Sequence, residues 1–268
     1  MLKIKKLLPK RKNDSFKGDY GKLLVVAGSE GMLGAAILTS RGAMRVGTGL
    51  VYLNVPAKVK ELANLATPEV IVSSELTNHY DAIAIGPGLG NRRKIVHSLL
   101  AKLSRSKYDR PIVIDADGLN ALAGKTGWLE NFGLNLILTP HPGEMARLLN
   151  KTTKEIQKIR DKIALHAARS FNCIMVLKGH RTVVASPEGK LYINKTGNPG
   201  MATAGVGDVL TGMIAGLAAQ GLSAWDAAVS GVYLHGLAGD LAANEKGQYG
   251  MIASDLIEQI PYAIQKNS

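Results

Sequence analysis

The chain has 268 residues, of which 46% are hydrophobic and 20% charged, a composition typical of a globular protein with a sizeable core. This length fits one large α/β domain or two small ones, and the composition argues against disorder except at the ends. The formal net charge is +12, but aromatic residues make up only 5% and no zinc-finger or helix-turn-helix pattern follows. We therefore expect anionic small molecules, and not nucleic acid, as partners.

The sequence argues against export and against a membrane. The N-terminus is basic but lacks the continuous apolar segment of a signal peptide, and no apolar run reaches membrane-spanning length. The single cysteine, Cys173, lies in an apolar run and is expected to be a buried core thiol. One cysteine allows no internal disulfide and no cysteine-based zinc site. We expect a cytoplasmic protein.

Apolar runs of strand length alternate with helical segments along the chain. The predicted strands cover 22–27, 50–54, 82–85, 111–114, 136–138 and 174–177, and 182–185 pairs with 190–194 as a hairpin. The predicted helices cover 35–46, a basic stretch ending near 107, 207–220, 224–244 and 254–264. The strands are apolar throughout, which predicts a mostly parallel sheet covered on both faces. We expect one domain over 18–268, preceded by a flexible basic segment over 1–17.

Glycine-rich turns follow two of the predicted strands. Gly28-Ser-Glu-Gly-Met-Leu-Gly-Ala-Ala36 precedes a helix but lacks the Gly-x-Gly-x-x-Gly spacing of a dinucleotide site. Gly86-Pro-Gly-Leu-Gly90 leaves backbone open to close approach. A tight turn without a ligand is the alternative interpretation of both.

Charged side chains follow two further strands. Asp115 and Asp117 fit a Mg²⁺ site, with capping of the next helix as the alternative role of Asp117. In Thr139-Pro-His-Pro-Gly-Glu144, the prolines fix the backbone and aim His141 and Glu144 into one region. Glu144 would position a water on Mg²⁺, and His141 would contact a substrate.

The densest signal is Gly197–Asp208, which leads directly into an apolar helix. A helix N-terminus offers free N–H groups and a positive dipole end to a phosphate. A carboxylate beside that phosphate can act as a base that deprotonates an attacking hydroxyl. Asp208 is therefore the candidate base. The alternative role of Asp208 is to cap the helix N-terminus. Lys178–Thr182 carries cations suited to a nucleotide phosphate, with an ordinary turn as the alternative.

The spacing Gly212-x-x-x-Gly216 lies inside the same apolar helix and resembles a membrane dimer motif. We expect it to let the helix lie close to the sheet. The glycine-rich and charged motifs above lie at the carboxyl ends of predicted parallel strands, where α/β folds bind ligands. This placement indicates an enzyme.

In their order along the chain, these motifs resemble those of the ribokinase-like superfamily and, within it, the ADP/ATP-dependent NAD(P)H-hydrate dehydratases. The resemblance rests on segments 28–36, 86–90, 115–120, 138–144, 177–182 and 196–208 and extends over about residues 18–264. It implies an α/β three-layer sandwich, with a mostly parallel central sheet, helices on both faces and a C-terminal β-hairpin plus helices.

The resemblance also implies a reaction: nucleotide-dependent dehydration of the S epimer of hydrated NADH or NADPH, a lyase activity of metabolite repair. Phosphorylation turns the C6 hydroxyl into phosphate, a better leaving group, and AMP is released where ADP is the donor. Asp208 matches the family's base. The N–H groups of Gly205, Val206 and Gly207 would form the anion hole, and Val206, where many relatives have a small polar residue, keeps its backbone donor.

Further site residues follow from the same resemblance. Substrate contacts fall on Ala36, Gly88, His141 and Asp208. Nucleotide contacts fall on Lys178, Gly179, His180, Arg181, Thr182 and Gly207. Glu144 corresponds to the superfamily's acidic residue that serves Mg²⁺, here through water.

The implied cofactors are Mg²⁺ and ADP or ATP as the phosphoryl donor, with the choice of nucleotide left open. Related proteins often carry an N-terminal epimerase domain, for which this chain is too short, so we expect a separate epimerase as functional partner. The family also implies a homo-oligomer, often a tetramer. The alternative is a ribokinase-like kinase of a vitamin-precursor alcohol, which would share Asp208 but stop at the phosphorylated product.

Overall fold

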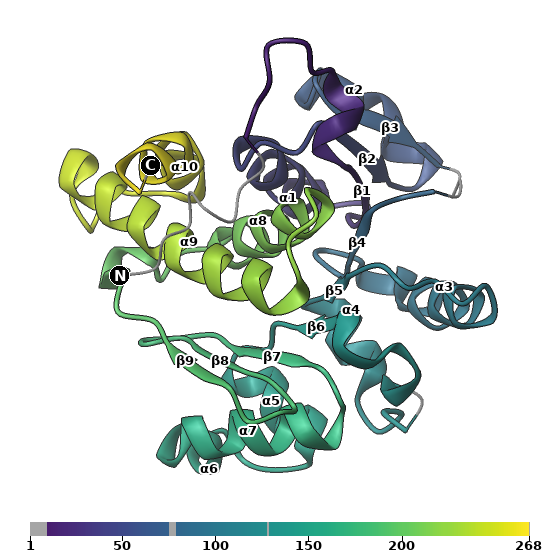
Figure 1. Cartoon of the computed structure of the whole chain (residues 1–268), viewed down its shortest axis with the longest axis vertical. Coiled ribbons are helices and arrows are strands. Elements are labelled where there is room, and N and C mark those ends of the chain that lie inside the picture. Colours follow the sequence, from purple (N-terminus) through teal and green to yellow (C-terminus); the bar gives the residue numbers. More distant parts are fainter. Residues whose placement is uncertain (1–9, 75–78, 128, 268) are drawn as a thin grey trace.

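The computed structural model describes residues 10–74, 79–127 and 129–267. Within these ranges, one nine-stranded sheet has the order β3-β2-β1-β4-β5-β6-β7-β8-β9. All pairs from β3 to β7 are parallel, whereas β7–β8 and β8–β9 are antiparallel. Helices cover both faces of the sheet (Figure 1). The expected three-layer sandwich with its hairpin is confirmed.

The predicted strands are all present, each within one residue at either end. The strands are β1 (Lys22–Val26), β2 (Leu50–Asn54), β3 (Ile71–Ser73), β4 (Ala82–Ile85), β5 (Ile112–Ile114), β6 (Leu136–Leu138), β7 (Ile174–Leu177), β8 (Val183–Ala185) and β9 (Leu191–Ile193). The edge strand β3 was not predicted. It has three residues, of which Ile71 is exposed, so it lacks the buried apolar run that marks the central strands.

The helices form two layers. They are α1 (Leu33–Arg45), α2 (Lys60–Ala66), α3 (Lys94–Arg105), α4 (Asp117–Leu122), α5 (Pro142–Leu149), α6 (Thr153–Lys158), α7 (Arg160–Ser170), α8 (Val206–Ala219), α9 (Ala224–Lys246) and α10 (Ala253–Lys266). Helices α1, α8, α9 and α10 pack on one face of the sheet, and α3 to α7 pack on the other.

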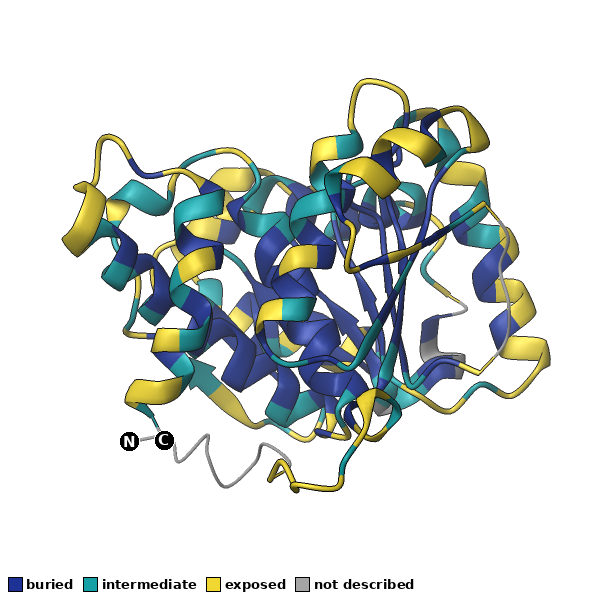
Figure 2. Ribbon diagram, turned by 90° about the horizontal axis from the view of Figure 1, so that it is seen from above, coloured by how far each residue is buried: buried dark blue, intermediate teal, exposed yellow. Residues whose placement is uncertain are grey.

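Alternation along the strands explains why two cores form. Leu23 and Val25 of β1 belong to the core beneath α1 and α8, whereas Leu24 and Val26 belong to the core beneath α3 and α5. Successive strand residues point to opposite faces of the sheet. A strand whose residues are all apolar therefore buries side chains on both faces. Figure 2 shows the sheet and the inner helix surfaces as the buried centre of the molecule.

The two glycines of the Gly212-x-x-x-Gly216 spacing face another helix, which corrects the expectation that they approach the sheet. A Cβ built on Gly212 would lie 1.9 Å from the carbonyl oxygen of Thr39 in α1. A Cβ on Gly216 would lie 3.0 Å from the Cα of Ala43, also in α1. The absence of side chains therefore lets α8 pack backbone to backbone on α1.

Part of the basic N-terminal segment, residues 1–9, lies outside the described residues. In the described remainder, the Arg11 guanidinium lies 4.0 Å from the centre of the Tyr20 ring and donates a hydrogen bond to the Gly47 carbonyl. Among the helices within the described ranges, none is both long and apolar enough to cross a membrane.

Candidate active site

The first turn of α8 is built as an anion-binding turn. Gly205 precedes the helix with φ +86°, a left-handed conformation that favours glycine. The first backbone hydrogen bond of the helix runs from the Val209 N–H to the Gly205 carbonyl. The N–H groups of Val206, Gly207 and Asp208 come before it and have no partner within the helix. They are free to bind an anion at the positive end of the helix dipole.

Asp208 is the third residue of α8, and the N-cap is Gly205. The alternative in which Asp208 merely caps the helix is therefore wrong. Burial, followed by the nearby Asp115 and Glu144 carboxylates, raises the pKa of Asp208 to about 7, while Lys178 opposes the rise. Asp208 makes no hydrogen bond or ion pair with any residue in the described ranges. A carboxylate in this state accepts a proton readily near neutral pH.

A buried ion pair lies beside Asp208. The Lys178 ammonium, at the end of β7, lies 2.5 Å from Oδ1 of Asp115, which follows β5 and is 1% exposed. The Thr211 hydroxyl of α8 donates a 2.6 Å hydrogen bond to the other oxygen, Oδ2. Both oxygens of Asp115 are thus occupied by protein groups, so Asp115 is not set up as a direct Mg²⁺ ligand.

Asp117 points elsewhere. It is the first residue of α4, so the predicted capping role is wrong, because the N-cap position belongs to Ala116. One Asp117 oxygen accepts a 2.8 Å hydrogen bond from the Gly90 N–H, and the other accepts one from Arg93 at 3.0 Å. Asp117 therefore fixes the glycine-rich 86–90 turn and does not share a metal with Asp115.

His141 and Glu144 form a reciprocal cap at the start of α5. The His141 Nδ1 accepts hydrogen bonds from the Gly143 and Glu144 N–H groups, and Glu144 Oε2 accepts one from the His141 N–H at 2.8 Å. Burial, with the Lys178 and Arg147 charges, lowers the pKa of His141. Its Nε2 carries the remaining proton and belongs to a half-exposed side chain. That nitrogen lies 3.4 Å from Oε1 of Glu144, and Nδ1 accepts from the backbone, so both ring nitrogens have partners within this cap.

The Glu144 carboxylate is 6% exposed and its Oε2 lies 4.0 Å from the Lys178 ammonium. Burial raises the pKa of Glu144, against the pull of Lys178. Asp115, Glu144 and Asp208 thus share one ammonium. No cluster of three metal-ligating side chains occurs in the described part of the chain. Carboxylate oxygens of this kind are the donors that suit Mg²⁺ together with waters and substrate phosphates.

A cavity of about 610 Å³ opens beside the first turn of α8. Its lining includes Gly207 and the whole predicted nucleotide segment, Lys178–Thr182. Val206 also lines it, and a Cβ on Gly207 would lie 3.5 Å from the Lys178 ammonium. The structure thus brings the lysine and the free N–H groups together at one end of a cavity of ligand size.

Several lining residues were missed by sequence reasoning. They include Asn194, Thr196, Asn198, Leu210, Val232 and His235. His235 lies inside the apolar helix α9, where it resembles a core residue, and its Nε2 donates to the Val206 carbonyl at 2.9 Å. Burial lowers the pKa of His235 to about 4, so it is neutral there. Thr196 and Asn198 belong to the 196–208 segment, and that position alone could have indicated them.

Ala36 and Gly88 do not line this cavity. The Ala36 side chain is fully buried, and a Cβ built on Gly28 would lie 2.9 Å from it. The Gly28 N–H donates to the Pro87 carbonyl at 2.8 Å, so the two glycine-rich turns are joined over the ends of β1 and β4. A Cβ on Gly88 would lie 2.7 Å from the Met32 carbonyl oxygen. Both turns are tight, which explains their glycines without a ligand.

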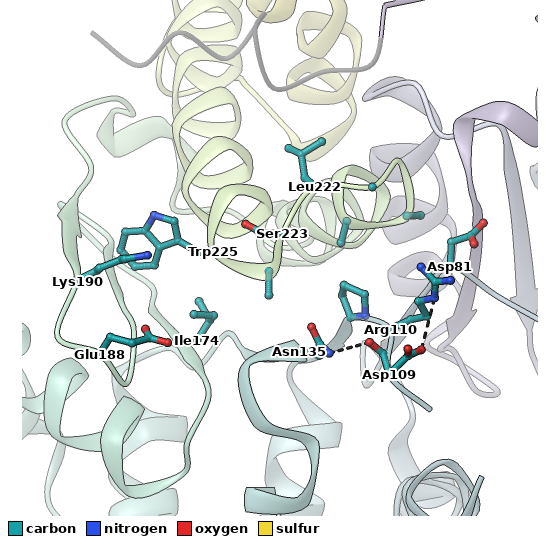
Figure 3. A pocket seen from close by; sticks show the side chains of 15 residues that line it. Asp81, Asp109, Arg110, Asn135, Ile174, Glu188, Lys190, Leu222, Ser223 and Trp225 are labelled. Atoms are coloured by element: carbon teal, nitrogen blue, oxygen red, sulfur yellow. Dashed lines mark hydrogen bonds and ion pairs between the residues drawn. The ribbon is translucent and has the colours of Figure 1, made fainter. Parts of the chain in front are cut away.

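A second cavity, of about 430 Å³, lies at the amino ends of the strands. Asp81, Arg110 and Asn135 come from the amino ends of strands, and Trp225 belongs to α9 (Figure 3). The Lys190 ammonium lies 5.9 Å from the centre of the Trp225 ring. None of the site residues predicted from the sequence lines this cavity. The residues predicted for the site therefore lie away from this cavity.

The comparisons with known proteins agree with this geometry. A family model described as NAD(P)H-hydrate dehydratase matches residues 23–262. The chain is 46% identical over 276 aligned positions to the "Bifunctional NAD(P)H-hydrate repair enzyme Nnr" of Moorella thermoacetica, covering 96% of this chain but only 52% of that protein. It is 41% identical to the ADP-dependent (S)-NAD(P)H-hydrate dehydratase of Neisseria meningitidis serogroup B, covering 92% of this chain and 86% of that protein. The chain thus spans about half the length of the first relative.

Solved structures are similar over nearly the whole chain. The ADP/ATP-dependent NAD(P)H-hydrate dehydratase of Bacillus subtilis, co-crystallized with ATP and Mg²⁺, superposes with a TM-score of 0.86 at 36% identity, covering 97% of this chain and 95% of that one. A ribokinase-like superfamily protein of Enterococcus faecalis superposes with a TM-score of 0.85 at 27% identity, covering 100% and 95%. The expected ribokinase-like fold is confirmed.

Proposed function

The chain belongs to the NAD(P)H-hydrate dehydratase family, and from that membership we propose that it dehydrates the S epimer of hydrated NADH or NADPH, with an adenine nucleotide as phosphoryl donor. The observation that carries the proposal is the placement of Asp208, a carboxylate with no hydrogen bond or ion pair to the described residues, in the first turn of α8, whose Val206 and Gly207 line a cavity of ligand size. Burial raises the pKa of this carboxylate to about 7. A binding protein without turnover has no use for such a base.

The proposed reaction has two steps. Asp208 accepts the proton of the C6 hydroxyl, the hydroxyl oxygen attacks the terminal phosphorus of the nucleotide, and the bond from phosphorus to the departing nucleotide oxygen breaks. The N–H groups of Gly205, Val206 and Gly207 stabilise the charge on the transferred group. The ring nitrogen lone pair then expels phosphate from C6, and loss of the C5 proton restores the double bond. With ADP, the products are NAD(P)H, AMP, phosphate and a proton.

Nucleotide binding is assigned to Lys178–Thr182 and Gly207. The lining combines the Lys178 ammonium and the Gly207 backbone with the apolar side chains of Val232 and Leu210, which suits a ligand that carries both phosphates and a base. Mg²⁺, when bound through water by Glu144, would neutralise charge on the phosphates. The substrate contacts remain Ala36, Gly88, His141 and Asp208. Because the Ala36 side chain is buried, we assign this substrate contact to the turn around Ala36 and not to the side chain itself.

Further proposals concern partners. A relative of about twice the length is named as a bifunctional repair enzyme. We propose that an NAD(P)H-hydrate epimerase is the functional partner of this chain in the cytoplasm. We also propose that the chain forms a homotetramer. Size-exclusion chromatography coupled to light scattering tests this directly.

The deciding experiment is the incubation of the purified chain with S-epimeric hydrated NADH, Mg²⁺ and either ADP or ATP. We expect the absorbance of NADH to return, one phosphate to appear per NADH, and no return without nucleotide. A phosphorylated hydrate that accumulates without dehydration would instead support the small-molecule kinase. Running both nucleotides in parallel identifies the preferred donor.

A further inference from the structure

We propose that Asp115 is a positioning residue, which holds the Lys178 ammonium against the first turn of α8 where the transferred phosphoryl group would lie. This inference rests on the proposed function and adds a residue to it. Asp115 reaches neither solvent nor the cavity, since its side chain is 1% exposed and it is absent from the cavity lining. Any effect of Asp115 on the chemistry therefore acts through its neighbours.

The contacts of Asp115 form a two-sided clamp. Its Oδ1 binds the Lys178 ammonium at 2.5 Å, and its Oδ2 accepts the Thr211 hydroxyl at 2.6 Å. Thr211 stands one helical turn below Gly207 and lies 3.3 Å from the Gly207 carbonyl. The carboxylate thus connects the end of β7 to the first turn of α8, and its own orientation is fixed by that helix.

The lysine needs such a clamp because its ammonium is a mobile point charge on a flexible stem. A Cβ built on Gly207 would lie 3.5 Å from this ammonium. The ammonium thus lies directly against the proposed anion hole. The charge of the lysine and the N–H groups of α8 therefore converge on the same place. A displaced lysine would leave the N–H groups alone to stabilise the transferred group.

Asp115 also shapes the electrostatics of the base. The charged groups that face Asp208 are Asp115 beyond β5, Glu144 on α5 and Lys178 at the end of β7. Asp115 and Glu144 raise the pKa of Asp208, and Lys178 lowers it. Loss of the Asp115 charge removes a raising influence, which lowers the pKa of Asp208. Displacement of the Lys178 ammonium removes the smaller, opposing influence and offsets part of this change.

The test compares Asp115→Asn with the wild type and with Asp161→Asn, the same exchange at an exposed carboxylate of α7. We expect kcat for Asp115→Asn to fall about tenfold to a hundredfold, because the lysine is misplaced, and the Kd for ADP to rise, because the displaced ammonium no longer contacts the phosphates. The acidic limb of the pH profile of kcat/KM should move to lower pH by about half a unit or more. Asp161→Asn should match the wild type. A fall in kcat with an unmoved limb would indicate a merely structural role and overturn the inference.

Thr211→Val keeps the Asp115 charge and removes only its clamp on α8. We expect a smaller loss of kcat, an unmoved acidic limb, and recovery in Thr211→Ser. This variant also decides the question if Asp115→Asn fails to fold. Wild-type kcat in Thr211→Val would contradict the clamp.

Crystal structures with ADP separate this inference from the proposed function. We expect the Lys178 ammonium to contact the ADP phosphates in the wild type and to be displaced in Asp115→Asn. If the wild type shows this contact but does not dehydrate the hydrate, the proposed function fails and the positioning role stands. An ammonium that keeps its place in Asp115→Asn overturns the positioning role alone.

Discussion

Asp208 is held in an environment that favours its neutral form, although its proposed role needs the charged one. Burial and two neighbouring carboxylates raise its pKa to about 7, and no described side chain compensates with a hydrogen bond. The raised pKa makes it a stronger base than an exposed aspartate. The same environment weakens the fold at neutral pH, because the folded state there holds an unfavourable charge.

The first prediction concerns the chemistry of this residue. Asp208→Asn should lower kcat by about 10³-fold or more, because the amide has no basicity, while ADP binds about as well as before. Recovery of NADH absorbance and calorimetric titration with ADP measure the two effects. Substantial turnover in the variant would remove Asp208 as the base.

The pH dependence of the wild type follows from the same group. Asp208 must be ionised to accept a proton, so kcat/KM should rise with pH up to about 7 and then level off, falling about tenfold per unit below that point. Initial rates between pH 5 and 9 check this. A profile that stays flat down to pH 5 would show that no group with a pKa near 7 acts as the base.

Stability should respond to Asp208 in the opposite direction. Because the folded state raises this pKa, the folded state binds the proton more tightly, so stability falls as pH rises from about 4 to 7. Asp208→Asn removes that loss and should raise the free energy of unfolding at pH 8 by on the order of 2 kcal/mol, with a higher Tm. At pH 3.5, where Asp208 is protonated in the folded state and mostly protonated in the unfolded state, variant and wild type should melt nearly alike. An equal difference at both pH values would exclude this origin.

Single residues also show what the sequence can and cannot predict at the site. Asp208 and Lys178–Thr182 could be found because glycines and charges at strand ends form local patterns. The partnership of Lys178 with Asp115 joins residues 63 positions apart, and such spacing carries no signal. The local pattern also misled, since Asp117 serves the 86–90 turn.

At the scale of elements, the contact between α1 and α8 decides where the anion-binding turn stands. The two helices touch through Gly212 and Gly42, whose absent side chains admit the backbone of the partner helix. The sequence predicted both helices from their apolar character but not their contact, because a glycine spacing does not reveal which surface it faces. The edge strand β3 was missed for a related reason: with three residues and one exposed face, it depends on pairing with β2.

Gly212→Ala should separate these helices. The new Cβ would lie 1.9 Å from the Thr39 carbonyl oxygen, so backbone must shift, and we expect a loss of about 2–3 kcal/mol in the free energy of unfolding. Gly34→Ala is the matched control within α1, where nothing lies within 4 Å of the new Cβ, and it should stabilise by up to about 1 kcal/mol. Urea denaturation measures both. Equal stability of the two variants would show that the contact is not tight.

At the scale of the whole molecule, the net charge of +12 should raise the rate at which anionic substrates meet the protein. The proposed substrates are anionic, so a basic protein attracts them over roughly a Debye length. We expect kcat/KM for ADP to fall about threefold to tenfold between 50 and 500 mM KCl, while kcat changes little. Steady-state rates at several salt concentrations test this. A parallel fall in kcat would point to a site disturbed by salt.

The layer formed by α8, α9 and α10 also has a consequence for synthesis on the ribosome. These helices cover one face of the sheet, yet they come after every strand in the chain. While translation proceeds, the nascent sheet exposes the apolar residues of that face until the segment beyond residue 205 has emerged. Such a surface attracts chaperones or other nascent chains. A chain released before residue 205 lacks both Asp208 and the helices that cover this face of the sheet. Such an unfinished chain has no catalytic base and no protection from aggregation.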